Sequence, residues 1–397
     1  MKICILSSFE DSMQKDSGAS IRIYNLAKGL AATGNDVTVI MPKYEAASEL
    51  AEGVKIHCLR GLSSQAMLKV LKKFVNVGRP TALYFYDFLF VFRVSKLVRE
   101  TDVVQIEQQS SGGLVVPFIK KVLKKPVVVD CHDVFQALRV KHTSLLRRIL
   151  ETFLEKLVYK NADLLLAVSE NEKDCLISNG FQQSSIKVIP NGVDTNAFGK
   201  ASNLKDIQKK YRLENFRVVV FVGNLDYAPN REALQALSSV IAPKVLDKIK
   251  DVKFLVVGKM NDKIELPRLM ATGFVDNVSD VLSISDVAVA PLFQGSGTRL
   301  KILEYFSCGL PVVSTSIGAE GLNAKDGVNI FIEDNLEVFA LRIIELLKNK
   351  ELSTAMGNAA RVVATTTYDW KIITKKLEAD LCNMLSEYYA KVQTRPT

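Results

Sequence analysis

The sequence predicts an α/β protein built from two parallel-sheet domains, and three observations support this prediction. Short apolar runs alternate with helix-length amphipathic segments, and the same alternation restarts midway along the chain. The chain has 397 residues, which is enough for two hydrophobic cores. Its 48% hydrophobic and 24% charged residues are ordinary globular values and exclude a disordered or fibrous protein.

The first half of the chain opens with a predicted strand and an amphipathic helix. The strand covers residues 2–8, and the helix covers residues 20–34 and ends at Gly34. Strands that alternate with helices indicate a parallel sheet with helices on both faces. The further strands predicted in this half cover residues 36–41, 54–59, 102–106, 126–130 and 162–169.

A Pro-Asn-Gly turn at residues 190–192 separates the two halves. We therefore expect one Rossmann-like α/β/α domain over residues 1–195, a second over residues 196–365, and a helical segment over residues 366–397. Ligands bind at the carboxyl ends of parallel strands, so a cleft between the two domains is the expected ligand site. The strands predicted after the turn cover residues 217–223, 252–258, 286–292 and 310–315.

The net charge of +9 is concentrated in one region, since residues 60–148 contain 16 Lys and Arg against 6 Asp and Glu. Basic surfaces attract nucleic acid, anionic lipid or phosphorylated small molecules. No nucleic-acid-binding module is recognisable, so nucleic acid is not an expected partner. Within this region, residues 82–92 are rich in aromatic side chains, which suits either the core of the first domain or a surface lying on anionic lipid.

The cellular compartment can be predicted from the apolar runs, the first residues and the cysteine spacing of the sequence. No apolar run reaches the roughly 18 residues of a membrane-spanning helix, and residues 1–12 do not have the pattern of a secretory signal. The six cysteines have neither metal-ligand nor redox spacing, as is typical of reduced thiols. We therefore expect a cytoplasmic protein, with the basic region offering contact with the inner face of the cell membrane.

Residues 295–315 have the sequence GSGTRLKILEYFSCGLPVVST and follow a predicted strand. Gly295 and Gly297 let backbone N–H groups approach a ligand, and a helix predicted to begin near residues 296–298 offers a partial positive charge. Arg299 and Lys301 add two full charges beside it. The pattern predicts a cradle for a diphosphate.

Glu304 is predicted to lie two turns into this helix, where a carboxylate suits paired sugar hydroxyls better than phosphate. Dinucleotide-binding folds use an acidic residue on ribose in this way. The alternative is a solvated helix face on which Lys301 and Glu304 pair at i, i+3 spacing and the glycines serve only the turn. Residue chemistry alone leaves both readings open.

At this point the chain resembles the retaining glycosyltransferases of family 4, which have the GT-B fold. The resemblance covers nearly the whole chain through blocks in a fixed order, and the last block is similar to a closing helix that crosses back onto the first domain. It implies two Rossmann-like domains facing each other across a cleft. The blocks are SGASIRIYNLAKGLAATGNDVTVI, VVVDCHD, ADLLLAVSENEKDCL, IKVIPNGVDTNAF, VVFVGNLDYAPNREAL, FLVVG, GFVDNVSDVLSISDVAVAPL, residues 295–315 and YDWKIITKKLEADL.

The resemblance also implies a donor site. Glu304 matches the second glutamate of the family's pair and would hold the ribose hydroxyls of the donor nucleotide. The first glutamate is replaced by Ser296, which leaves the identity of the sugar open. The expected donor-binding residues are Gly18, Gly223, Asn224, Gly273, Phe274, Val275, Ser296, Gly297, Thr298, Leu300 and Glu304.

Two cations usual in the family are absent from the loop that follows Gly223. Asn224 stands where an arginine is expected, and Arg231 is the nearest substitute for the expected lysine. Arg299 and Lys301 are therefore the candidates to stabilise the leaving diphosphate, because the leaving charge needs cations nearby but not on one particular loop.

The resemblance implies that His132 contacts the transferred sugar or the acceptor, and Asp133 beside it is the candidate acceptor-binding residue. The plainer reading of a lone histidine or of Gly18 is structural. No Asp-x-Asp motif is present, which agrees with a site that needs no metal and no cofactor beyond the nucleoside diphosphate sugar as co-substrate.

The expected reaction moves a sugar, with retention, from a nucleoside diphosphate to a hydroxyl of a glycan, lipid-linked glycan or glycolipid, as in polysaccharide or glycolipid biosynthesis. Two rival readings remain. One is a sugar-nucleotide 2-epimerase of the same architecture, which would need acid and base groups that this histidine-poor chain supplies sparsely. The other is a donor-binding subunit that has lost activity, suggested by Ser296 and Asn224.

Overall fold

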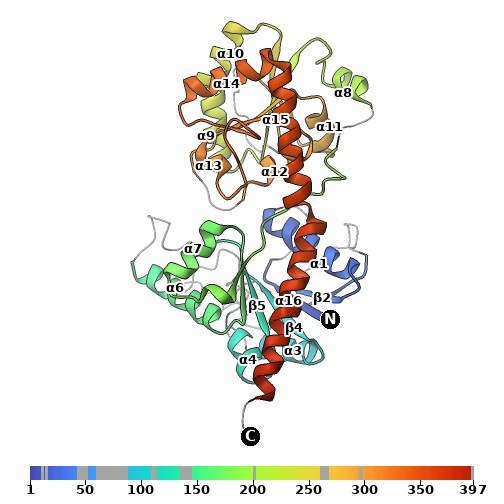
Figure 1. Cartoon of the computed structure of the whole chain (residues 1–397), viewed down its shortest axis with the longest axis vertical. Coiled ribbons are helices and arrows are strands. Elements are labelled where there is room, and N and C mark those ends of the chain that lie inside the picture. Colours follow the sequence, from blue (N-terminus) through green and yellow to red (C-terminus); the bar gives the residue numbers. More distant parts are fainter. Residues whose placement is uncertain are drawn as a thin grey trace. The chain divides into compact units, whose positions relative to one another are not determined.

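The computed structural model describes most of the chain as two compact units. Unit 1 comprises Met1–Pro190 and Trp370–Thr397, and unit 2 comprises Asn191–Asp369, so the chain passes between them twice (Figure 1). The described residues are 1–9, 13, 17–42, 52–59, 88–108, 113, 115–134, 145–199, 203–259, 268–294 and 298–394.

Unit 1 is built on a parallel sheet in the order β3-β2-β1-β4-β5-β6-β7. Successive side chains of a strand face opposite sides, so Ile3 and Ile5 enter one core while Cys4 and Leu6 enter the other. Its strands are β1 Lys2–Ser7, β2 Asp36–Met41, β3 Val54–Cys58, β4 Val103–Glu107, β5 Val127–Cys131, β6 Leu164–Ala167 and β7 Ile186–Val188.

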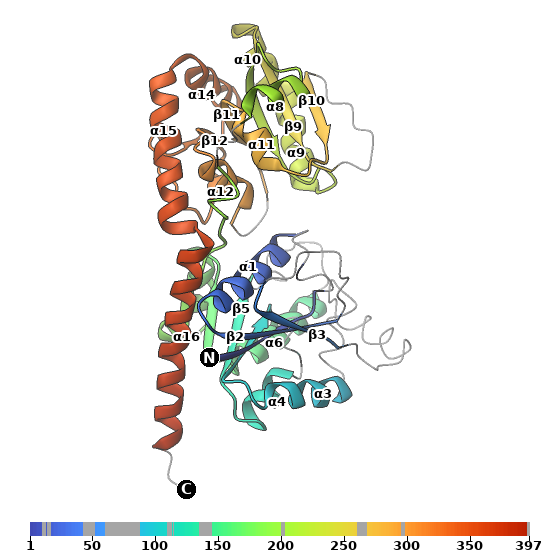
Figure 2. The ribbon, with the colours of Figure 1, turned by 90° about the vertical axis from the view of Figure 1, so that its right-hand side faces the viewer.

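Helices cover both faces of this sheet. The core on one face takes side chains from α1 and α16, and the core on the other takes them from α3, α4, α6 and α7 (Figure 2). The helices are α1 Gly18–Ala32, α3 Phe88–Val98, α4 Val115–Lys121, α6 Leu145–Lys160, α7 Glu170–Ser178 and α16 Trp370–Gln393, with a short 3₁₀ turn η3 at Gln183–Ser185.

The last helix, α16, completes the core of unit 1. Trp370, Ile373, Leu377 and Leu381 recur at helical spacing and are all buried against α1 and the sheet. Contact with α1 is close at Gly29, where an added Cβ would lie 2.4 Å from Thr374 Oγ1. Only glycine therefore allows the two helices to approach this closely.

Unit 2 has a parallel sheet in the order β10-β9-β8-β11-β12-β13. One face packs on α8, α11, α12 and α15, and the other on α9, α10 and α14. The strands are β8 Arg217–Val222, β9 Val252–Val257, β10 Leu269–Gly273, β11 Val287–Ala290, β12 Val312–Ser314 and β13 Phe331–Ile332. The helices are α8 Leu204–Lys210, α9 Ala228–Ala236, α10 Ala242–Lys248, α11 Val278–Ser283, α12 Leu300–Ser307, α13 Ser316–Ala319, α14 Leu336–Lys348 and α15 Lys350–Val363, with π-helical segments η4 at Leu237–Ile241 and η5 at Ala364–Tyr368.

Both units are three-layer α/β/α structures, which confirms the predicted fold class. All strands of each sheet are parallel, but the chain adds its first strands toward one edge and its later strands toward the other. The change occurs between β1 and β4 in unit 1 and between β8 and β11 in unit 2. Such switch points leave a crevice at the carboxyl ends of the strands, where ligands bind in open α/β sheets. Within the described part of the chain, no helix combines the length and the apolar character needed to cross a bilayer.

Candidate active site

At the switch point of unit 2, α12 places a lysine over the end of β8. Lys301 Nζ lies 4.2 Å from the ring centroid of Phe221 and donates a 2.8 Å hydrogen bond to Asn230 Oδ1. A Cβ on Gly223 would come within 2.9 Å of this nitrogen, so the glycine makes room for the cation. Lys301 thus reaches from α12 to the loop after Gly223, where the sequence has Asn224 in place of the expected arginine.

Asn230 holds this lysine in place. Its Nδ2 donates a 2.7 Å hydrogen bond to the carbonyl oxygen of Asn224, which leaves Oδ1 directed at Lys301. The helix itself is tied to β8, because the N–H of Val222 donates to the Tyr305 hydroxyl at 2.8 Å. The position of the Lys301 ammonium is therefore fixed from both sides.

The charges of Lys301 and Glu304 are poorly compensated. Burial lowers the pKa of Lys301 to about 7, because the stabilising charge of Glu304 is partly cancelled by Arg299. Burial raises the pKa of Glu304 to about 7 against the opposing effect of Lys301. No ion pair joins these two side chains among the described residues, and Lys301 bonds Asn230 instead, which argues against the alternative of a surface pair at i, i+3 spacing.

The helix begins later than the sequence predicts. Arg299 is the extended residue before the helix and Leu300 is the first helical residue, so Glu304 lies about one turn into α12 and not two. Arg299 Nη2 makes a long 3.5 Å bond to the carbonyl oxygen of Ile317. Thr298 is buried and its Oγ1 has no hydrogen-bond partner within the described ranges. Ser296 and Gly297 lie outside the described residues.

The remaining donor candidates of unit 2 lie at strand ends. Gly273 ends β10 in the left-handed region (φ 73°), which favours glycine, and Phe274 beside it is 74% exposed. Val275 and Leu300 pack against the core of the unit. Asn224 and Arg231 are both exposed, the second on α9.

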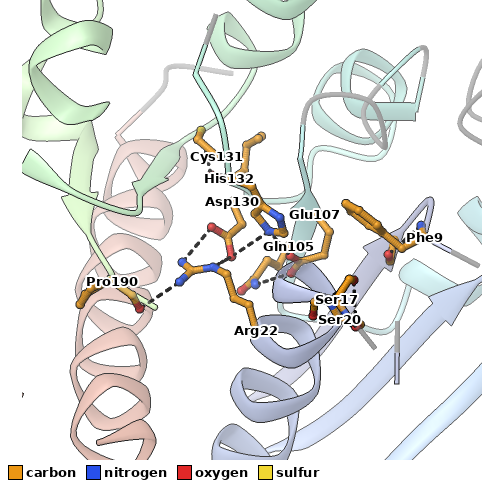
Figure 3. A network of polar contacts seen from close by, with 12 residues as sticks. Phe9, Ser17, Ser20, Arg22, Gln105, Glu107, Asp130, Cys131, His132 and Pro190 are labelled. Atoms are coloured by element: carbon orange, nitrogen blue, oxygen red, sulfur yellow. Dashed lines mark hydrogen bonds and ion pairs between the residues drawn. The ribbon is translucent and has the colours of Figure 1, made fainter. Parts of the chain in front are cut away.

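At the switch point of unit 1, α1 begins beside the ends of β1 and β4. Ser17 caps this helix: its Oγ accepts from the N–H of Ser20 at 3.3 Å, and Ser20 Oγ accepts from the N–H of Ser17 at 2.9 Å. Gly18 is the first helical residue. This opening turn lies next to the strand ends that carry the charged residues in Figure 3.

Four charged side chains form a buried network there (Figure 3). The guanidinium of Arg22 donates to both oxygens of Asp130, at 2.8 and 2.9 Å. His132 Nε2 lies 3.0 Å from Glu107 Oε2 and 3.7 Å from Asp130 Oδ2. Asp133 follows His132 and is partly buried.

The contacts favour the ionised forms of Asp130 and His132, whereas burial and the charge of Asp130 raise the pKa of Glu107. Burial alone would raise the pKa of Asp130, but Arg22 and His132 lower it to about 2. Burial alone would lower the pKa of His132, but Asp130 and Glu107 raise it to about 9. At neutral pH these shifts favour an imidazolium ring beside the Asp130 carboxylate.

Four residues of these clusters were not predicted as site residues. Arg22 lies on the buried face of the first helix, where a charged side chain is itself a signal, because buried charges need partners. Glu107 is the last residue of the apolar strand β4 and Asp130 is the penultimate residue of β5, which is a second signal. Asn230 carried none, since it acts through a contact 71 residues away in the sequence.

The fold and the placement of polar residues at both switch points define the class as GT-B. The chain belongs to the family 4, group 1 glycosyltransferases: residues 17–197 match the model described as Glycosyltransferase Family 4, and residues 216–349 match Glycosyl transferases group 1. Both predictions, of fold and of family, are confirmed.

Curated relatives and a solved structure agree with this assignment. The chain is 25% identical over 265 residues to the uncharacterized glycosyltransferase MJ1069 of Methanocaldococcus jannaschii, covering 62% of this chain and 65% of the relative. It is 28% identical over 240 residues, 56% of this chain and 60% of the relative, to UDP-Gal:alpha-D-GlcNAc-diphosphoundecaprenol alpha-1,3-galactosyltransferase of Escherichia coli. The matches thus span less than two thirds of these relatives. The crystal structure of Anabaena HepE in complex with UDP shares the fold, with a TM-score of 0.74 at 18% identity over 96% of this chain and 100% of that one.

Proposed function

We propose that the protein transfers a sugar, with retention, from a nucleoside diphosphate sugar to a hydroxyl of a glycan, lipid-linked glycan or glycolipid. Membership of a glycosyltransferase family supports the transfer. The Escherichia coli relative is named for a nucleotide-sugar donor and a diphosphoundecaprenol acceptor, which supports both substrate classes. The observation that carries the proposal is the Lys301 ammonium held over Gly223 at the switch point of unit 2.

In this proposal the leaving diphosphate lies against Arg299, Lys301 and the first N–H groups of α12. A buried lysine whose pKa lies near 7 gains its charge when an anion binds beside it. Preorganised donors of this kind lower a barrier by roughly 3 kcal/mol each, because they need no reorganisation as charge develops on the leaving oxygen. The cations supply this stabilisation without a metal ion.

Glu304 is proposed to accept hydrogen bonds from the ribose. Burial disfavours its ionised form in the absence of a ligand, and two hydroxyl donors would restore it. Gly273, Phe274 and Val275 are proposed to meet the nucleobase, for which the exposed ring of Phe274 offers a stacking face. His132 and Asp133, in unit 1, are proposed for the sugar and the acceptor.

A lipid-linked acceptor would bring the protein to the cytoplasmic face of the membrane. Much of the basic region, residues 60–87, lies outside the described residues. Within the described part, Phe90 is buried in the core, while Phe92 on the same helix is 50% exposed with Lys96 Nζ 5.0 Å from its ring. The aromatic run is thus divided between the core and a basic surface, which supports peripheral contact with anionic lipid.

The first test is a thermal-shift screen against nucleoside diphosphates and their sugars, followed by a transfer assay with the best donor. A ligand that binds only the folded state raises its melting temperature. Arg299→Ala should lower turnover at saturating donor by about 10²-fold, if it stabilises the leaving diphosphate. Lys244→Ala, which removes a surface cation of the same unit, is the control and should leave turnover unchanged.

Full turnover of Arg299→Ala would contradict the proposed role. A donor that binds but is neither transferred nor hydrolysed would indicate the inactive binding subunit. Conversion of the donor into its C2 epimer would indicate the epimerase.

A further inference from the structure

The charge network of unit 1 goes beyond a structural ion pair, because it determines which form of His132 meets a substrate. The charged groups around the ring are Arg22 from α1, Glu107 from β4 and Asp130 from β5, with Asp133 next in the chain. The ion-pair distances are 2.8 Å from Arg22 to Asp130, 3.0 Å from His132 to Glu107 and 3.7 Å from His132 to Asp130. The carboxylates of α6 and α7, Glu155 and Glu172, face the neighbouring thiol of Cys131.

Charge balance favours a doubly protonated ring. With both carboxylates ionised, Arg22, Asp130, His132 and Glu107 sum to zero only if both ring nitrogens of His132 carry protons. The competing neutral arrangement is a protonated Glu107 beside a neutral ring: burial and Asp130 raise the pKa of Glu107, whereas the hydrogen bonds from His132 and Gln105 lower it and favour the carboxylate. With a neutral ring, two buried carboxylates would face one buried cation, and an uncompensated buried charge is strongly unfavourable. The Glu107 carboxylate is also held in place. Gln105 Nε2 donates a 2.7 Å hydrogen bond to Glu107 Oε1, which leaves Oε2 for the His132 ring.

The ring is also held in its plane. Phe9 stacks on His132 with 5.8 Å between ring centroids and 21° between planes (Figure 3). Nε2 is directed at the carboxylates, so Nδ1 is the remaining donor, and it has no hydrogen-bond partner in the described ranges. About one tenth of the side chain is exposed, which leaves this edge within reach of a ligand.

We propose that Glu107 and Asp130 are positioning residues that hold His132 as an imidazolium, which makes it a fixed hydrogen-bond donor to a substrate oxygen and not a general base. The proposal rests on the proposed function, since it names what His132 does for the sugar or acceptor. A ring that already carries two protons cannot accept another. The proton of the acceptor hydroxyl must therefore leave through a different group.

The same three side chains lie close enough for a metal ion, with ligand atoms within 4.8 Å of one another. The observed pairing argues against that use. Arg22 occupies both oxygens of Asp130, and the network is neutral when the ring is protonated, so a divalent cation would add uncompensated charge.

An NMR titration tests the charge state without any substrate. The chain has three histidines, so the ring signals can be assigned with His57→Gln and His142→Gln. We expect His132 to stay protonated through pH 8 and to titrate near pH 9, because Asp130 and Glu107 raise its pKa to about 9. In Glu107→Gln the amide can donate to Nε2 of a neutral ring, so the midpoint should fall by about 1–3 pH units. Glu100→Gln, an exposed glutamate, is the control and should shift nothing.

A wild-type midpoint near the ordinary value of about 6.5 would overturn the proposal. So would binding of Zn²⁺ to the wild-type protein with loss of the His132 signal. Because this measurement uses the ligand-free protein, it fails or succeeds independently of the transferase assignment.

The pH dependence of the proposed transfer then separates a donor from a base. Lys301 and Glu304 have pKa values near 7, so they shape the pH profile of the wild type and of the unit 1 variants alike. The contribution of His132 is therefore read from the ratio of kcat/KM between the wild type and His132→Gln, whose side-chain amide is a neutral donor. A fixed donor predicts that this ratio stays level from about pH 6 to 8 and falls near pH 9. Relative to the wild type, Glu107→Gln should lose kcat/KM as the pH rises from about 6 to 8, while its melting temperature stays within a few degrees. A general base predicts the opposite, a ratio that is lost as the pH falls below about 7.

Discussion

The switch points of unit 1 and unit 2 both hold partly or fully buried charged side chains, but their charges are compensated differently. In unit 1 each charge has a partner: Arg22 binds Asp130, and His132 lies between Asp130 and Glu107. In unit 2 the ammonium of Lys301 has a single hydrogen-bond partner among the described residues, the neutral amide of Asn230. The pKa of His132 is accordingly raised, whereas that of Lys301 is lowered.

This difference separates two uses of buried charge. In the network of unit 1 the charges of Asp130 and His132 are favoured without a ligand, because their pKa values are moved away from neutral pH. The cluster of unit 2 is left with disfavoured charges on Lys301 and Glu304, which a diphosphate and a ribose would favour. An incomplete cluster is poor for stability and well suited to binding, as expected where function and stability compete.

The largest effect is expected from breaking the network of unit 1. Arg22→Met leaves Asp130 buried without its guanidinium, which should lower the free energy of unfolding by about 3–5 kcal/mol. Urea unfolding at neutral pH measures this. Lys55→Met breaks the exposed pair with Asp36 and should cost less than about 1 kcal/mol.

The pH dependence of that loss follows from Asp130. Its pKa in the folded protein, about 2, is below the ordinary value of about 3.9. The pair therefore stabilises the fold above about pH 4, and its contribution disappears as the pH falls toward 2. The difference between wild type and Arg22→Met should shrink over the same range; a constant difference would contradict this account.

A smaller change in stability but a large change in activity is expected in unit 2. Lys301→Met should lower turnover by roughly 10²–10³-fold. The free energy of unfolding should change by no more than about 1 kcal/mol, because the lost bond to Asn230 is offset by removal of a charge that burial disfavours. Lys209→Met on the exposed face of α8 is the matched control. A strongly destabilised Lys301→Met would show that both switch points are structural.

The smallest effect expected is a proton taken up on ligand binding. At pH 8 Lys301 is largely neutral in the free protein, because its pKa is about 7. A bound diphosphate favours the charged form, so UDP binding should take up a fraction of one proton. Calorimetry in buffers of different ionisation enthalpy measures the uptake, and it should vanish in Lys301→Met. Equal uptake by both proteins would place the titrating group elsewhere.

Much of the fold was predictable because it follows from local patterns. Apolar runs bounded by turns gave the strands, and Ser17 to Gly34 held the start and stop signals of α1. The start of α12 was predicted too early, because the glycines and cations of residues 295–299 resemble a helix beginning. Arg299 instead keeps an extended backbone before Leu300.

The candidate site was predictable only in part. The sequence marked Lys301 and His132, because a cation near a glycine turn and a histidine after a strand stand out by type and place. Their partners do not stand out, since Asn230 and Glu107 are common residues whose roles arise from contact.

Local sequence patterns specify the two α/β/α units and the residues at their strand ends, because side-chain periodicity and turn chemistry act over a few neighbouring residues. The charge states of the buried groups depend instead on the tertiary structure. Arg22 meets Asp130 across 108 residues, and Lys301 meets Asn230 across 71. The pKa of a buried group depends on solvent removal and on charges a few ångströms away, and both are set by packing between segments far apart in the chain.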